Sequence, residues 1–149
     1  MKKTVLMGMS GSGKTTLIQS LLGEERRYNK TQTVEHYLHF IDTPGEYIEH
    51  RSFYRALIMT AVDAELIGLV QDVGRASWIP PAFATTFAKP VFGIVTKTDL
   101  AGGTNLAEAR DVLVRAGADP VFEVSAFTGA GMDDLWRYLD QPDDQAVAA

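Results

Sequence analysis

Short apolar runs alternate with longer amphipathic segments along this chain. In the runs, successive residues are apolar, which is typical of strands buried on both faces of a parallel sheet. In the longer segments, apolar residues recur three and four positions apart, which is typical of helices. The predicted strands are residues 4–7, 37–41, 66–71, 91–95 and 121–124. The predicted helices are residues 14–22, 47–61, 105–116 and 132–139, with a shorter one at 81–87.

The order of these elements predicts the fold class. Strands that alternate with helical crossovers form a mostly parallel sheet, with right-handed connections and helices on both faces. We therefore expect a single α/β domain over residues 1–140 with a five-stranded sheet. Residues 141–149, QPDDQAVAA, lack the pattern and are expected to form a disordered acidic tail. Ligands of such sheets bind beyond the carboxyl ends of the strands, so the residues at those ends are the functional candidates.

Composition narrows the choice of partners. The chain has 149 residues, enough for one domain with a substantial core. Its net charge of −5 disfavours nucleic acid as the main partner, because phosphate backbones attract clustered Lys and Arg. Cysteine is absent, which fits a reducing, cytoplasmic setting. The apolar run after Lys3 ends at Gly8, too short for a signal peptide, and no window is long enough for a membrane helix, so no membrane partner is expected.

The stretch GMSGSGKTT lies between the first predicted strand and the first predicted helix. A glycine, four residues and then Gly-Lys-Thr is the spacing of a phosphate-binding P-loop. Such a loop aims backbone N–H groups at phosphate oxygens, and the following helix adds its positive end. We expect Lys14 to bridge the β and γ phosphates of a nucleotide and the hydroxyl of Thr15 to ligate Mg²⁺. The predicted nucleotide-binding residues of this stretch are Gly8, Ser10, Gly11, Ser12, Gly13, Lys14, Thr15 and Thr16.

The second predicted strand ends in FIDTPG. A carboxylate at the end of a buried strand is costly unless it is paired or near a metal. Asp42 is therefore predicted to face the Mg²⁺ beside Thr15, and Gly45 to bring its backbone N–H to the γ phosphate.

The fourth predicted strand runs into TKTD and the fifth into Ser125 and Ala126. A carboxylate at Asp99 accepts hydrogen bonds from N1–H and N2–H of guanine, whereas adenine lacks both donors, and a site built around such bonds rejects the wrong base. Lys97 is expected to lay its methylene stem over the base, and the backbone N–H of Ala126 to meet guanine O6. These motifs predict GTP or GDP as the ligand, with base-side residues Thr96, Lys97, Asp99, Ser125 and Ala126.

In this order, the motifs resemble those of the P-loop GTPases in a minimal, Ras-like form. The resemblance makes Thr33, in TQTVE, the candidate switch threonine and a third Mg²⁺ ligand, and it makes Lys14, Thr33, Gly45 and Glu46 the candidate catalytic residues. The whole chain also resembles the ethanolamine and propanediol utilisation family of small P-loop proteins, EutP and PduV. The resemblance rests on GKTTLIQSLLGE, YNKTQTVE, FIDTPGEYIEHRSFYRALIMTAVDA and GIVTKTDLA. It implies a cytoplasmic bacterial protein associated with a microcompartment, with shell or enzyme proteins as partners.

Three features depart from the GTPase pattern. The segment from Thr33 to Asp42 is too short for the extra antiparallel strand of most GTPases, so the expected strand order is 2-1-3-4-5. Thr96 replaces the more usual asparagine, which predicts the loss of a hydrogen-bond pattern that braces the loop and a softer guanine selectivity. Glu46 replaces the glutamine that orients water in some signalling GTPases, so slow hydrolysis is expected. Glu46 is either a base or, as we prefer, a solvent-facing glutamate favoured by the helix dipole.

Three functions stay open. The favoured hypothesis is a GTP-binding switch whose Thr33 and Asp42 segments reorder when the γ phosphate is lost. The second is an ATP-dependent kinase of a small carboxylate such as acetate, in which Arg51 or Arg55 positions the acceptor in line with the γ phosphate. The third is a nucleotide-occupied but catalytically idle adaptor for a microcompartment shell.

Overall fold

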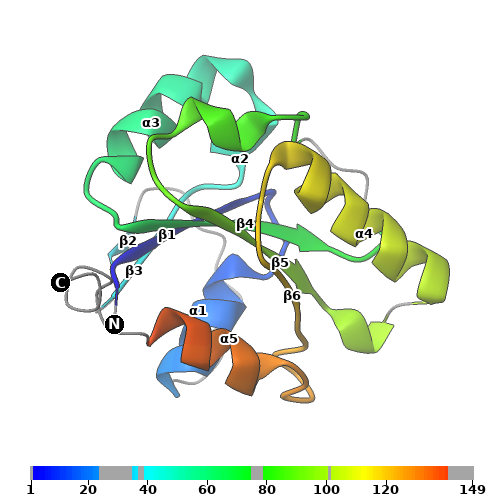
Figure 1. The fold of residues 1–149 in the computed structure, drawn as a ribbon. Coiled ribbons are helices and arrows are strands. Elements are labelled where there is room, and N and C mark those ends of the chain that lie inside the picture. The colour runs from blue at the N-terminus through cyan, green and yellow to red at the C-terminus, as the bar shows by residue number, and fades with distance from the viewer. Residues whose placement is uncertain (1, 24–34, 37–38, 75–78, 101, 141–149) are drawn as a thin grey trace, which may run out of the picture.

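Figure 1 shows the fold of the chain in a computed structural model, which describes residues 2–23, 35–36, 39–74, 79–100 and 102–140. Within these residues, no helix is long and apolar enough to span a lipid bilayer. The segments predicted around Thr33 and beyond residue 140 lie outside the described residues.

One sheet organises the described residues, and its strand order is β2-β3-β1-β4-β5-β6. Every neighbouring pair from β3 to β6 is parallel, so these five strands have the predicted order 2-1-3-4-5. The bounds are β1 (Thr4–Gly8), β2 (Glu35–His36), β3 (Phe40–Asp42), β4 (Leu66–Asp72), β5 (Val91–Thr96) and β6 (Val121–Glu123).

The two-residue strand β2 corrects one expectation. The segment before Asp42 was predicted to be too short for an antiparallel strand, yet Glu35 pairs with Asp42 and His36 with Ile41 in antiparallel register. An antiparallel pair needs no long crossover, unlike a parallel one, so a short segment suffices to add it at the sheet edge.

Helices connect the strands much as the apolar spacing predicts. Two of the predicted helices, 14–22 and 132–139, coincide with α1 and α5, whereas the helix predicted over 47–61 is interrupted. At His50 the backbone is extended, with φ −127° and ψ 126°, so the chain makes separate turns before and after it. The bounds are α1 (Lys14–Leu22), α2 (Glu46–Glu49), η1 (Arg51–Phe53), α3 (Tyr54–Ala61), η2 (Phe83–Thr86), η3 (Thr98–Leu100), α4 (Gly103–Ala116) and α5 (Met132–Leu139).

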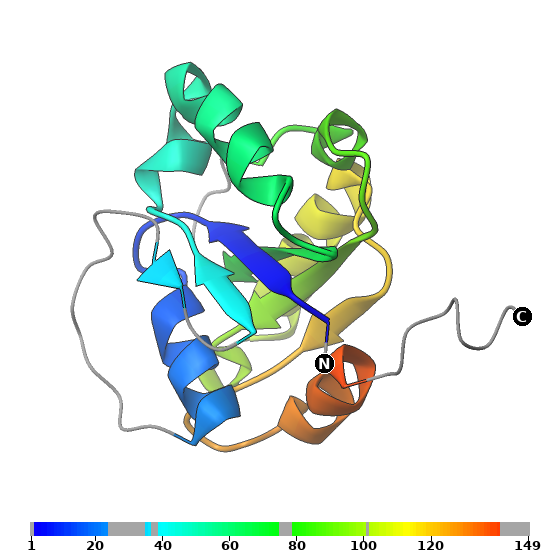
Figure 2. The same cartoon turned by 90° about the vertical axis from the view of Figure 1, so that its left-hand side faces the viewer.

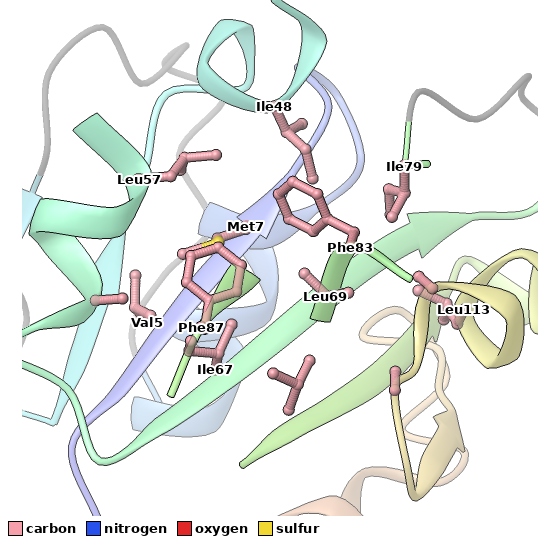
Figure 3. Close-up of a cluster of buried hydrophobic side chains, with 14 of the residues drawn as sticks. Val5, Met7, Ile48, Leu57, Ile67, Leu69, Ile79, Phe83, Phe87 and Leu113 are labelled. Carbon is pink, nitrogen blue, oxygen red and sulfur yellow. The ribbon is translucent and has the colours of Figure 1, made fainter. Parts of the chain in front are cut away.

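The helices cover both faces of the sheet, as predicted. Figures 1 and 2 show α1 and α5 on one face and α2, α3 and α4 on the other. Alternate residues of β1 enter two separate clusters: Leu6 packs with Leu17 of α1, while Val5 and Met7 pack with Leu57 of α3. Figure 3 shows the cluster that contains Val5, Met7 and Leu57. Because helices bury both faces of the sheet, we look for the functional site at the carboxyl ends of its strands, where ligands of parallel sheets bind.

Candidate functional site

The loop between β1 and α1 has the backbone geometry that a P-loop requires. Gly11 and Gly13 have φ of 79° and 97°, in the left-handed region that favours glycine. Gly8 is needed for a different reason, since a Cβ there would lie 2.6 Å from the carbonyl oxygen of Val70 in the neighbouring strand. The predicted glycine spacing therefore reflects two backbone constraints, one of conformation and one of close approach.

Lys14 begins α1 and lies inside the curl of this loop. Its side chain is buried, and its ammonium donates hydrogen bonds to the carbonyl oxygens of Gly8 at 2.7 Å and Met9 at 3.1 Å. A buried ammonium is tolerated only when its charge is compensated by such acceptors or by a counterion. The arrangement holds a positive charge at the centre of the loop, beside the amino end of α1.

Thr15 and Asp42 come together although they are far apart in the sequence. The Thr15 hydroxyl donates a hydrogen bond to the Asp42 carboxylate, and Asp42 is fully buried at the end of β3. Among the described residues, no group of three His, Cys, Asp or Glu side chains gathers as a metal-binding cluster. A hydroxyl and one carboxylate fit Mg²⁺ nonetheless, because this ion typically takes one or two protein oxygens and completes its shell with phosphates and water.

The DTPG segment lies directly against the P-loop. Thr43 fastens it to β1 by donating a hydrogen bond to the Leu6 carbonyl oxygen at 2.8 Å. A Cβ on Gly45 would lie 2.0 Å from the backbone nitrogen of Ser10, so no larger residue fits without moving one of the two loops. Glu46, next along the chain, is exposed in the first turn of α2. The structure thus places Gly45 beside the phosphate loop and Glu46 toward solvent.

The two predicted arginines follow the DTPG segment and lie on the surface. Arg51 in η1 and Arg55 in α3 are exposed. Both follow the break at His50, and η1 leads directly into α3, so the two arginines lie on successive turns after that break. Thr33 lies outside the residues that the structure describes.

A pocket of about 400 Å³ adjoins the P-loop and collects most of the predicted base-side residues. Its walls come from the start of α1, the end of β5 and the loop after β6, which are far apart in sequence. The lining residues are Gly13, Thr16, Leu17, Thr96, Lys97, Asp99, Leu100, Val124, Ala126 and Phe127.

Ser125, which the sequence assigned to the base side, lies behind this pocket. It is fully buried, and its hydroxyl donates a 2.8 Å hydrogen bond to Asp99 Oδ1. The Ser125 hydroxyl oxygen also accepts a hydrogen bond from the backbone N–H of Thr128 at 3.1 Å. Ser125 therefore ties the Asp99 carboxylate to the turn after β6.

Thr96 corrects a second expectation. Its hydroxyl donates a 2.5 Å hydrogen bond to the carbonyl oxygen of Ser12, so the P-loop is braced from β5 without an asparagine. Lys97, with φ of 61°, adds a second brace: its ammonium donates a 2.7 Å hydrogen bond to the Gly11 carbonyl oxygen. A non-glycine residue in this conformation costs of order 1–3 kcal/mol, so the surrounding contacts must hold it there.

The sequence reasoning missed Asp72, at the end of β4. Its carboxylate is buried and lies 3.3 Å from the Lys97 ammonium. It also missed Leu100 and Phe127, which line the pocket beside the predicted Asp99 and Ala126. A signal for Asp72 was available, since the apolar run LIGLV ends in two polar residues, Gln71 and Asp72, at the same sheet edge as Asp42.

Solved structures with this fold include Era bound to MgGDPNP and ribosomal RNA. The likeness has a TM-score of 0.66 at 21% identity and covers 93% of this chain and 55% of that one. At this identity it shows the fold, and it confirms the predicted α/β architecture with a mostly parallel sheet.

The sequence relatives carry the likeness further. Propanediol utilization protein PduV of Citrobacter freundii is 42% identical over 94% of both chains. Probable acetate kinase EutP of Escherichia coli K12 is 33% identical over 93% of this chain and 89% of its own length. The family described as ethanolamine utilisation and propanediol utilisation, PduV-EutP, matches residues 1–141. This chain, as its motifs predicted, belongs to the PduV-EutP family of ethanolamine and propanediol utilisation proteins.

Proposed function

We propose that this chain binds guanine nucleotides with Mg²⁺ and acts as a switch with slow hydrolysis in ethanolamine or propanediol utilisation. One observation carries the proposal: the pocket that holds Asp99 and Ala126 is continuous with the P-loop through Gly13 and Thr16. A base in that pocket and phosphates in the loop therefore belong to one ligand.

The phosphate side supports a nucleoside di- or triphosphate. Lys14 supplies positive charge inside the loop, and α1 adds the positive end of its dipole. Mg²⁺, held by Thr15 and Asp42, would neutralise charge on the phosphates and fix their orientation. The backbone N–H of Gly45 is the candidate donor to a γ phosphate, because its loop lies against Ser10.

The base side supports guanine. Asp99 has a carboxylate anchored by Ser125, and two acceptor oxygens match the two adjacent donors on the guanine edge. Adenine presents no such donor pair, so it leaves the carboxylate without its partners in the pocket. The hydrogen bond from Thr96 to Ser12 fixes the base-side loop relative to the phosphate loop. This favours a stronger preference for guanine than the sequence predicted from the absence of the usual asparagine.

We expect slow hydrolysis because of the position of Glu46, the acidic residue that directly follows the γ-phosphate candidate Gly45. Glu46 is exposed at the start of α2, where water solvates its carboxylate. A general base must be held within hydrogen-bond reach of the proton that it takes, and an exposed side chain has no packing to hold it there. We further propose that the switch acts in the cytoplasm with microcompartment shell or enzyme proteins, and membership of an ethanolamine and propanediol utilisation family supports this.

A second function is favoured by the name of one relative, the probable acetate kinase EutP. In that reaction an acetate oxygen bonds to the γ phosphorus of ATP while the bond to the β–γ bridging oxygen breaks. ADP leaves with that electron pair, and acetyl phosphate forms. Here Lys14 would offset charge on the phosphates, and Arg51 or Arg55 would need to move toward the loop to hold the carboxylate.

Calorimetric titration of nucleotide-free protein with MgGTP and then MgATP tests the proposal. We expect GTP to bind at least tenfold more tightly, about 1.4 kcal/mol. Parallel incubation of the protein with ATP and acetate measures acetyl phosphate. Equal or tighter ATP binding together with acetyl phosphate would make the kinase the function, and binding without any turnover would indicate an idle adaptor.

Two substitutions test the site itself. Lys14→Ala is expected to abolish binding of both nucleotides, and Asp99→Asn to weaken GTP while improving xanthosine triphosphate, which carries an acceptor where guanine carries its amino group. Asp111→Asn is the matched control, because Asp111 is an exposed aspartate on α4 that pairs with Arg115 outside the pocket. No exchange of base preference in Asp99→Asn would refute the guanine assignment.

A further inference from the structure

Two apolar side chains stand exposed at the mouth of the base pocket. Leu100 and Phe127 are 72% and 76% exposed, the highest values among the large hydrophobic side chains that the structure describes. Both line the pocket that contains Asp99. Exposed apolar groups that converge on one concave site favour a ligand that covers them.

Each of these side chains directly follows a residue predicted to meet the base. Leu100 follows Asp99 in η3, and Phe127 follows Ala126 after β6. A backbone hydrogen bond from Thr98 to the Val124 carbonyl oxygen, 3.2 Å long, joins the two loops. Each loop therefore places a residue predicted to bond the edge of a base next to an exposed apolar side chain. This arrangement suits a flat ring whose edge carries hydrogen-bonding groups.

The backbone around Phe127 is held in place, although the ring is exposed. Gly129 donates a hydrogen bond to the Ser125 carbonyl oxygen at 2.8 Å, and Ser125 donates one to the Ala130 carbonyl oxygen at 2.9 Å. The Ser125 hydroxyl accepts a third from Thr128. Because the turn is fixed, stacking on Phe127 requires ordering of little more than the two torsions of one side chain.

We propose that Phe127 is a stacking platform for the purine ring, so that Phe127 contributes equally to the binding of guanine and adenine, whereas Asp99 contributes to the preference for guanine. This inference rests on the proposed nucleotide-binding function. A phenyl ring stacks on any base, since every base has a π face, and such stacking accounts for roughly 5- to 150-fold in affinity per base. Carboxylate recognition, by contrast, depends on the donors at the edge of the ring.

The two contributions separate in a set of binding measurements on the full chain. Phe127→Ala is expected to weaken MgGTP and MgATP by the same factor, about tenfold, and to leave tripolyphosphate binding unchanged. Phe127→Tyr is expected to retain parent affinity, whereas Phe127→Leu is not, because leucine restores apolar area without a π face. Asp99→Asn is expected to change the GTP to ATP ratio instead.

Val114→Ala is the matched control, since Val114 is 55% exposed on α4 and does not line the pocket. Urea unfolding of each variant checks that the fold is intact, and the exposure of Phe127 predicts little change. If Phe127→Ala binds both nucleotides like the parent, or Phe127→Leu does, stacking is refuted while the nucleotide site stands. A loss confined to GTP also refutes it, and a parent that binds no nucleotide overturns both proposals.

Discussion

Replacing Ser125 by alanine tests whether a buried hydroxyl positions the base-reading carboxylate. The Ser125 hydroxyl donates to Asp99 at 2.8 Å and accepts from the Thr128 amide at 3.1 Å. A hydrogen bond to a charged group contributes about 1.5–3 kcal/mol, but the exposure of Asp99 reduces this to about 1 kcal/mol. In the variant, the Thr128 amide loses its bond to Ser125 but can bond water instead, because Thr128 is exposed. We therefore expect the free energy of unfolding to fall by about 1–2 kcal/mol in total.

The same substitution has a separate effect on nucleotide selectivity. In the parent, Ser125 holds the Asp99 side chain before any ligand arrives. In the variant, binding must immobilise that side chain, which costs about 0.5–1.5 kcal/mol. We expect GTP affinity to fall about fivefold and ATP affinity to stay constant, because adenine makes no bond to the carboxylate.

Urea unfolding and calorimetric titration with both nucleotides measure the two effects on one protein preparation. Thr60→Ala is the control for the loss of a hydroxyl, because the Thr60 hydroxyl donates to the Ala56 carbonyl oxygen within α3, at 2.8 Å, and Thr60 does not line the pocket. If stability falls while both affinities stay at the parent level, Ser125 braces the turn but does not position Asp99. Equal losses for GTP and ATP would contradict the reasoning in another way, since they would show a disturbed pocket.

Three further substitutions probe the framework of the site, each measured by urea unfolding. Gly68→Ala is expected to lower stability by about 1–3 kcal/mol, because its Cβ would lie 2.7 Å from Leu6 Cδ2 and 2.9 Å from Phe92 Cζ, both in fully buried side chains. An unchanged urea midpoint of unfolding would contradict this. Ser12→Ala is expected to raise stability by about 1 kcal/mol, because its buried hydroxyl has no hydrogen-bond partner within the described part of the chain, and a loss of stability would reveal one. Thr96→Val, which keeps the shape and removes the bond to Ser12, is expected to lower stability by about 1 kcal/mol and to weaken GTP; parent-like values for both would show that this brace is dispensable.

The local pattern of the sequence determined the elements and their order. Successive apolar residues are needed wherever a strand is buried on both faces, so β1, β4 and β5 were readable within one or two residues of their ends. Gly11 and Gly13 were predictable for a similar reason, since only glycine readily adopts the backbone angles of the loop. The polar residues after each strand then marked the sheet edge where Asp42 and Asp99 lie.

Contacts between distant segments were decided by the tertiary structure alone. The bond from Thr96 to Ser12 spans 84 positions of sequence, and it forms because β5 and the P-loop end at the same edge of the folded sheet. The sequence showed only that a threonine replaced an asparagine, so the loss of a brace was predicted and was wrong. The pairing of Lys97 with Asp72 likewise depends on β5 lying next to β4. Residue type and spacing determine what a segment is able to do, but the sheet order determines which side chains meet.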